Sequence, residues 1–168
     1  MVALEYYDIV LSSCAYDKYT EKKLGFSKIF IVDPEHDKNI IYSSDKRAMH
    51  MVKDNSVSAV ICIDYEIDKK LVQLMGKNNT ILCIPLPSAK QRFALSKDLY
   101  RLQNLFAYAL KSKVRTTFIS LAASQEYMCS YMQLIEFAKF VGATEDYARL
   151  CISEFTASAF NLAENEMK

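Results

Sequence analysis

Glycine, histidine and tryptophan are scarce in this chain of 168 residues, which has three Gly, two His and no Trp. Gly25, Gly76 and Gly142 are far apart, whereas the GxGxxG dinucleotide turn and the Walker P-loop each need closely spaced glycines. The sequence therefore excludes both of these nucleotide-binding motifs. His36 and His50 alone leave little for a histidine-rich metal site.

Long apolar segments are also missing. The longest apolar runs contain about six residues, at 81–86 and 105–110, far short of the roughly 18 that a membrane-spanning helix needs. The N-terminal segment carries Glu5 and Asp8 in place of a basic region, so we expect no signal peptide and a cytoplasmic protein. The five Cys are odd in number and form no CxxC motif, which in a reducing compartment favours buried thiols over disulfides or metal ligands.

Hydrophobic residues make up 51% of the chain and charged residues 24%, a balance typical of a folded globular protein. The length suits a single domain over residues 1–168. The strands that we expect are 6–12, 28–32, 39–42, 57–63, 80–84 and 116–120. The expected helices are 18–24, 44–55, 66–75, 95–112, 130–141 and one that begins at residue 144.

Strands and helices that alternate in this way imply parallel strand pairing with right-handed crossovers. A doubly wound α/β sheet and a TIM-barrel-like fold both fit the pattern. A full eight-fold barrel typically needs about 250 residues, so a barrel in this chain is expected to be shortened or incomplete. We expect Gly25 and Gly142 to end two of the helices, and Gly76 to take a left-handed position after a third.

Basic side chains gather in one segment of a nearly neutral chain, whose net charge is +1. Residues 90–115 hold seven basic side chains and one acidic one, a net charge of +6, which leaves −5 for the remainder. The basic residues are Lys90, Arg92, Lys97, Arg101, Lys111, Lys113 and Arg115. Any contact with nucleic acid is therefore expected in this segment.

Within the expected helix 95–112, one face opposite the apolar face carries Lys97, Arg101, Asn104, Tyr108 and Lys111. Cations interleaved with an aromatic ring suit phosphate contacts and stacking on an unpaired base. The alternative is an ordinary solvated face, since amphipathic helices commonly expose lysine. A second, weaker basic group occupies positions 46, 47, 50 and 53.

Other candidate chemistries have weaker patterns. Asp8, Asp33 and Asp64 lie in or just after expected strands, where Asp33 and Asp64 could coordinate Mg²⁺. The favoured explanation is that Asp33 starts a turn before Pro34 and that Asp64 begins a loop into a helix. Cys14 and Cys129 lack the signature of an activating histidine, and the sequence has no Gly-x-Ser-x-Gly elbow.

The arrangement as a whole resembles the archaeal and eukaryotic ribonuclease P protein component 3 family, most clearly over about residues 90–155. In that family a long helix ends in a basic segment, a strand reading roughly hydrophobic–Ser–Ser–Ala follows, and two helices then flank a glycine. The matching segments are 95–102 (LSKDLYRL), 111–115 (KSKVR), 118–123 (FISLAA), 134–143 (LIEFAKFVGA) and 148–153 (ARLCIS). Upstream, Leu24-Gly25-Phe26 and Ile67-Asp68 match further steps of the family pattern.

Some positions depart from the family. Relatives carry an Arg-x-Pro-x-Asp segment where this chain has CSYMQ at 129–133, and their Ser-Ser pair is Ser120-Leu121 here. The chain is also shorter than most relatives, mainly near its N-terminus, which allows for a trimmed barrel.

The resemblance implies a TIM-barrel-like protein subunit of ribonuclease P, which removes the 5′ leader from precursor tRNA. Catalysis and its Mg²⁺ then belong to the RNA subunit, and the protein has no catalytic residue, metal or cofactor of its own. The implied partners are the ribonuclease P RNA, protein component 2 and other protein subunits, with precursor tRNA as the substrate of the complex and no membrane. The RNA contacts are then expected from Lys90, Arg92, Lys97, Arg101, Tyr108, Lys111, Lys113 and Arg115.

Two other functions stay open at this point. A metal-dependent phosphoesterase of related barrel fold is one, and the scarcity of histidine argues against it. The other is a module that binds only protein, whose function would survive neutralisation of Lys97, Arg101 and Lys111.

Overall fold

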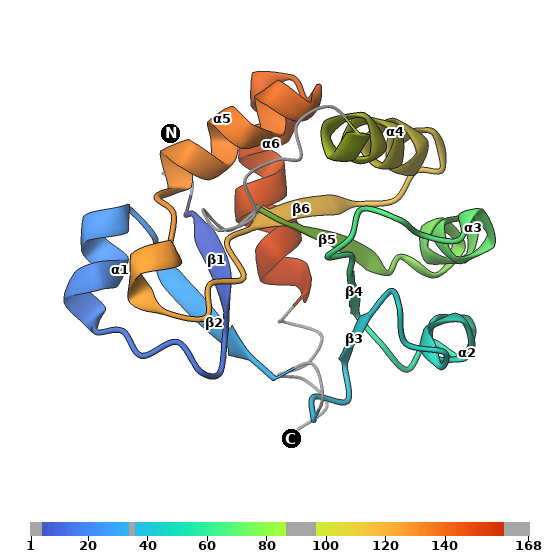
Figure 1. Cartoon of the computed structure of the whole chain (residues 1–168), viewed down its shortest axis with the longest axis horizontal. Helices are drawn as coiled ribbons and strands as arrows, with labels where there is room; N and C mark the ends of the chain where they lie inside the picture. The colour runs from blue at the N-terminus through green and yellow to red at the C-terminus, as the bar shows by residue number, and fades with distance from the viewer. Residues whose placement is uncertain (1–4, 34–35, 87–96, 160–168) are drawn as a thin grey trace.

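The computed structural model describes residues 5–33, 36–86 and 97–159 (Figure 1). Strands form in this part of the chain at all six places where the sequence predicts them, because each is a short run rich in β-branched residues. They are β1 (Tyr7–Leu11), β2 (Lys28–Val32), β3 (Ile40–Tyr42), β4 (Ala59–Ile61), β5 (Ile81–Pro85) and β6 (Thr116–Ile119).

All strand pairs are parallel, as predicted. β1 pairs with β2, and a second sheet has the order β3-β4-β5-β6. Two backbone hydrogen bonds link the sheets, since Leu121 N donates to Ile9 O (2.9 Å) and Leu11 N donates to Ala122 O (3.0 Å). The lateral order is therefore β2, β1, β6, β5, β4 and β3, with β6 joined to β1 through the residues that directly follow it. Within the described residues no ladder joins β2 to β3, so a closed barrel is not formed there.

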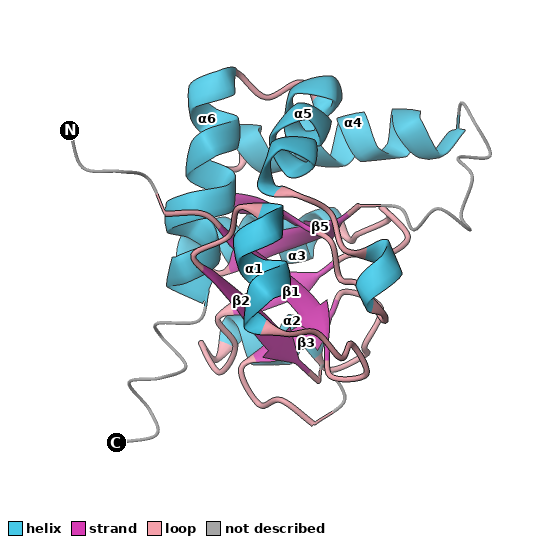
Figure 2. Ribbon diagram, turned by 90° about the vertical axis from the view of Figure 1, so that its left-hand side faces the viewer, coloured by secondary structure: helices cyan, strands magenta, loops and turns pink. Residues whose placement is uncertain are grey.

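The helices surround these strands (Figures 1 and 2). They are α1 (Lys18–Leu24), α2 (Ala48–Lys53), α3 (Lys69–Asn78), α4 (Lys97–Lys111), α5 (Tyr131–Val141) and α6 (Glu145–Leu150), with a 3-10 turn η1 (Gln125–Tyr127) and a π-helical turn η2 (Cys151–Phe155) that extends α6. Gly25 (φ 82°) and Gly142 (φ 121°) end α1 and α5, as the sequence predicts.

The prediction for Gly76 is wrong. This residue lies inside α3, and Asn79 takes the left-handed position at the end of the helix (φ 56°). A Cβ at position 76 would lie 2.2 Å from the carbonyl oxygen of Ser112, so glycine is needed there for a close approach of two backbones. Gly76 therefore sets how near α3 lies to the turn that follows α4.

Two hydrophobic clusters lie on opposite faces of the strands, because successive side chains alternate between the faces. In β5, for example, Leu82 and Ile84 belong to the cluster beneath the helices, while Ile81 and Cys83 belong to the other. That second cluster draws side chains from all six strands, so the strands curve around a shared interior. The helical segment after α6 closes this interior, since Ala159 belongs to the cluster and Thr156 Oγ1 lies 2.6 Å from Thr117 Oγ1 of β6.

Candidate nucleic-acid interface

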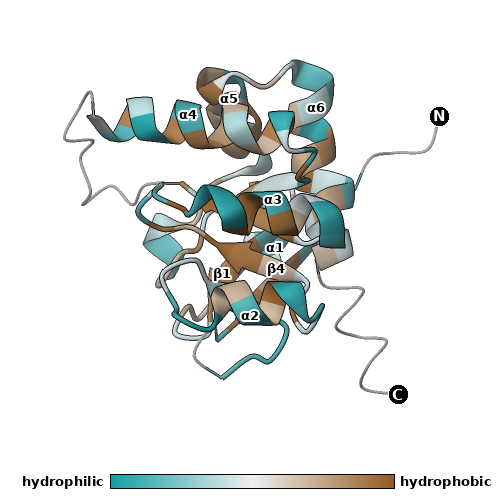
Figure 3. Cartoon of the chain, turned by 90° about the vertical axis from the view of Figure 1, so that its right-hand side faces the viewer, coloured by the Kyte–Doolittle hydropathy of each residue, from teal (hydrophilic) through white to brown (hydrophobic). Residues whose placement is uncertain are grey.

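α4 is amphipathic, as predicted. Leu102, Phe106 and Ala109 are buried against the strands, and the helix packs between α3 and α5. Its first turns extend beyond the edge of the strands, where the polar face is visible (Figure 3). The polar face of α4 is therefore accessible along most of its length.

A groove of about 600 Å³ separates this face of α4 from the start of α3. It lies at the carboxyl ends of the strands, because Tyr65, which lines it, donates a hydrogen bond from its hydroxyl to the carbonyl of Pro85 at the end of β5 (3.0 Å). In parallel α/β proteins this edge of the sheet is where ligands bind. The lining residues are Tyr65, Glu66, Ile67, Lys69, Tyr100, Arg101, Asn104, Leu105 and Tyr108.

Three members of the predicted basic face line the groove together, namely Arg101, Asn104 and Tyr108. Arg101 Nη2 lies 2.5 Å from Glu66 Oε1, and its Nη1 lies 3.7 Å from Asp98 Oδ1. Its charge is thus balanced locally by two carboxylates. The two ion pairs hold the guanidinium at the groove wall, where its planar face can stack on a base.

Tyr108 is held from the α3 side of the groove. Its hydroxyl accepts a hydrogen bond from Gln73 Nε2 (3.0 Å), and Lys69 Nζ lies 5.8 Å from the centre of its ring. A cation at that distance from an aromatic face is attracted to it. Lys69 therefore brings a positive charge to the groove that the sequence analysis did not predict.

Tyr65, Lys69 and Tyr100 are groove residues that the sequence analysis missed. Tyr100 is 67% exposed, a large value for an aromatic side chain, and it directly precedes Arg101. The sequence does hold one signal for the groove, namely the adjacent Tyr100 and Arg101 in the first turns of the amphipathic helix α4. Tyr65 lies in the loop before α3 and Lys69 begins α3, and no spacing in the sequence connects either residue with α4.

Three other predicted RNA-binding residues, Lys111, Lys113 and Arg115, are described by the structure and do not line the groove. Lys111 and Lys113 are exposed at the other end of α4. Arg115 lies at the amino edge of β6, where its Nη2 donates to the carbonyl of Asn79 (3.0 Å), so it has a structural contact at the opposite edge of the sheet. Arg115 therefore lies away from the groove, and its RNA contact stays a prediction.

Part of the predicted set cannot be placed. Lys90 and Arg92 lie outside the described residues, and of Lys97 only the backbone, which begins α4, lies within them. In the weaker basic group, Arg47 pairs with Asp45 (2.8 Å) and the His50 ring contacts Asp54 (3.0 Å), so two of its four members have acidic neighbours.

The three aspartates of the candidate Mg²⁺ site have separate roles. Asp33 contacts the His36 ring (2.9 Å), and Asp64 accepts a hydrogen bond from the backbone N of Glu66 (3.3 Å). Asp8 is buried in β1. Over residues 5–33, 36–86 and 97–159 no group of three or more His, Cys, Asp or Glu side chains is arranged to hold a metal ion.

Burial raises the pKa of Asp8 to about 6, against an ordinary value of 3.8. Hydrogen bonds from the backbone N of Ile9 (2.8 Å) and from the backbone N (2.7 Å) and hydroxyl (2.5 Å) of Ser120 partly oppose that rise. Burial likewise raises the pKa of the Cys14 thiol, and that of Cys129 to about 11. Both thiols are protonated at neutral pH and are therefore poor nucleophiles.

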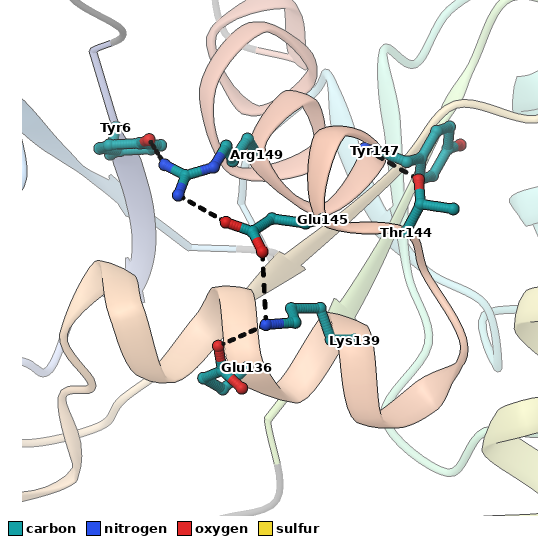
Figure 4. A network of polar contacts seen from close by, with 7 residues as sticks. All are labelled: Tyr6, Glu136, Lys139, Thr144, Glu145, Tyr147 and Arg149. Atoms are coloured by element: carbon teal, nitrogen blue, oxygen red, sulfur yellow. Dashed lines mark hydrogen bonds and ion pairs between the residues drawn. The ribbon is translucent and has the colours of Figure 1, made fainter.

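A chain of ion pairs joins α5 to α6 (Figure 4). Arg149 donates to the Tyr6 hydroxyl (2.8 Å) and to Glu145 (2.7 Å), and Glu145 and Glu136 both contact Lys139 (3.6 and 2.8 Å). This network fixes the segment before β1 to the two helices. Arg149, part of the family-like segment 148–153, thus has a structural role here.

No protein-family model matches the chain, and no curated protein matches it either. Of the helices in the described ranges, none combines the length and the apolar character needed to cross a bilayer.

Proposed function

We propose that this chain is an RNA-binding protein subunit of a ribonuclease P-type complex, in which the RNA subunit performs catalysis. The observation that carries the proposal is the groove between α3 and α4. It combines an exposed aromatic ring on Tyr100, a guanidinium on Arg101 and a lysine at position 69. Rings that stack on unpaired bases, together with cations that contact phosphates, are what proteins use to bind single-stranded RNA.

The arrangement of the strands supports the family resemblance. Six parallel strands share one interior, and their lateral order follows the chain except for the open step between β2 and β3. An incomplete TIM-like barrel has this arrangement. In the proposed complex the partners are the ribonuclease P RNA, component 2 and other protein subunits, with precursor tRNA as substrate and Mg²⁺ on the RNA.

Replacement of Tyr100 by alanine tests the proposal. Stacking of one base on an aromatic ring is worth about 1–3 kcal/mol, so Tyr100→Ala should weaken binding to single-stranded RNA about 5- to 150-fold. Fluorescence anisotropy with a labelled, unstructured RNA measures the change. Tyr19→Ala on α1 is the matched control, since Tyr19 is 72% exposed and lies outside the groove.

Equal RNA affinity in the Tyr100→Ala and Tyr19→Ala proteins would contradict the proposed role of the groove. Binding of component 2 without any RNA binding would instead support the alternative of a module that binds only protein.

A further inference from the structure

Glu66 is an unexpected residue in a site for a polyanion. Among the residues that line the groove in the described part of the chain, it is the one with an acidic side chain. Its side chain is 58% exposed, so it does not serve to fill the core. A carboxylate there repels phosphate, and its presence calls for an explanation other than general affinity for RNA.

The carboxylate is held in place while keeping capacity for further hydrogen bonds. Arg101 Nη2 contacts Oε1 at 2.5 Å, and Asp64 receives the backbone N–H of Glu66 (3.3 Å), so both ends of the residue are anchored. An ionised carboxylate has about four lone-pair sites on its two oxygens and only accepts hydrogen bonds. One contact from Arg101 therefore leaves both oxygens able to accept further donors.

Guanine is the base whose hydrogen-bonding edge matches such an acceptor. Its Watson–Crick edge presents two adjacent donors, N1–H and the N2 amino group. Adenine and cytosine each place an acceptor beside a single donor, and uracil has one donor between two acceptors. Two parallel N–H···O bonds to one carboxylate thus favour guanine, while each other base brings an acceptor close to the negative charge.

The rest of the groove can hold an unpaired nucleotide around that contact. Tyr100 and the guanidinium of Arg101 provide surfaces for stacking a base, and Lys69 provides a cation for its phosphate. The volume of about 600 Å³ lies within the ~300–1,000 Å³ of typical ligand sites.

We propose that the α3–α4 groove selects an unpaired guanine, with the Glu66 carboxylate accepting hydrogen bonds from guanine N1–H and N2–H. This inference rests on the proposed function, because it assumes that the groove binds single-stranded RNA. It adds a base preference and assigns the preference to one side chain.

The test uses five labelled RNA heptamers with three uridines on each side of a central G, A, C, U or inosine. The wild-type protein is expected to bind the G heptamer about tenfold more tightly than the A, C or U heptamers. Inosine lacks the N2 amino group, so its heptamer should have an intermediate affinity. In Glu66→Gln the preference for G should fall to about twofold or less, since an amide places a donor beside its acceptor.

Glu136→Gln is the matched control, because Glu136 is also an exposed glutamate in an ion pair (2.8 Å to Lys139) and lies outside the groove. This variant should keep the full preference for G. Circular dichroism and thermal unfolding of both variants verify that they fold.

The outcomes separate the two proposals. Binding of all heptamers with equal affinity overturns the guanine inference and leaves the proposed function intact. A preference for G that persists in Glu66→Gln overturns the role of Glu66. Absence of binding to every heptamer at low salt overturns the proposed function, and the inference with it.

Discussion

Asp8 holds a fully buried carboxyl group between β1 and the segment after β6. Three hydrogen-bond donors surround it, two from Ser120 and one from the backbone of Ile9. These donors favour the ionised form, but burial has the larger effect and raises the pKa to about 6. The folded protein therefore takes up a proton at this site more readily than the unfolded chain does.

This shift predicts a pH dependence of stability. Because the pKa of Asp8 is higher in the folded state (about 6) than its ordinary value of 3.8, its stabilising contribution is complete below pH 3.8 and is lost as the pH rises through about 6. A difference of about two pKa units corresponds to roughly 3 kcal/mol.

Asp8→Asn removes this dependence. The amide oxygen can accept the N–H groups of Ile9 and Ser120, and its NH₂ group can donate to the Ser120 hydroxyl, so the hydrogen bonds survive without the buried charge. Between pH 4 and pH 7, the free energy of unfolding should rise in the variant relative to wild type, by up to about 3 kcal/mol. Urea unfolding at several pH values measures the difference, and a constant difference across that range would contradict the account.

At the scale of elements, the spacing of α3 and α4 defines the groove. That spacing depends on Gly76, where an added methyl group would lie 2.2 Å from the Ser112 carbonyl. The obstacle is backbone rather than a flexible side chain, so the two helices must separate to make room. The close approach at the carboxyl-terminal ends of α3 and α4 thus fixes the width of the groove, which is lined by the first residue of α3 and by residues 100–108 of α4.

Gly76→Ala should therefore destabilise the protein by about 1–3 kcal/mol, which lowers Tm by roughly 2–10 °C for a chain of this size. Lys77→Ala is the control, because Lys77 is exposed at the next position of the same helix. Differential scanning calorimetry compares the two variants. A Tm for Gly76→Ala equal to that of Lys77→Ala would show that the approach of the backbones is not tight.

Local signals explain why the elements themselves could be predicted. Each strand is a β-branched run, and Asp17, Ser130 and Thr144 accept the capping hydrogen bonds that start α1, α5 and α6. Gly76 could not be interpreted from local signals, because a glycine near a helix end usually has a left-handed conformation. The reason for glycine there is a contact with Ser112, which lies 36 residues further along the chain.

The groove was predictable only in part, for the same reason. Helical spacing brings Arg101 and Tyr108 to one face, and this was visible in the sequence. The ion pair joins Arg101 of α4 to Glu66 in the segment before α3, and Lys69 of α3 contacts Tyr108 of α4, so both contacts depend on packing. The contact of Arg115 with the carbonyl of Asn79 likewise depends on packing, because it joins the start of β6 to the end of α3.

At the scale of the whole molecule, the charge is close to zero, with a net value of +1. Long-range attraction for a polyanion is therefore weak, and the proposed RNA binding has to rest on a few local cations. Two cations line the groove, Lys69 and Arg101. Arg101 pairs with Glu66, whereas Lys69 lies beside the Tyr108 ring and has no carboxylate contact among the described residues.

Lys69→Ala should accordingly reduce the salt dependence of RNA binding. Loss of one phosphate contact with a single strand lowers the slope of log K against log salt by about 0.7. The exposed neighbour Lys70 lies outside the groove, so Lys70→Ala should keep the wild-type slope. Titrations at four salt concentrations determine both slopes, and identical slopes for the two variants would remove Lys69 from the interface.

The central claim is that this protein works as part of a ribonuclease P-type complex through its α3–α4 groove. The most direct test is to purify the tagged protein from its own cells and sequence the RNA that is recovered with it. We predict ribonuclease P RNA, together with component 2, in the wild-type and Tyr19→Ala samples, and a clear loss of that RNA in a Tyr100→Ala, Lys69→Ala double variant. Recovery of no specific RNA with the wild-type protein, or equal recovery with the double variant, would contradict the account.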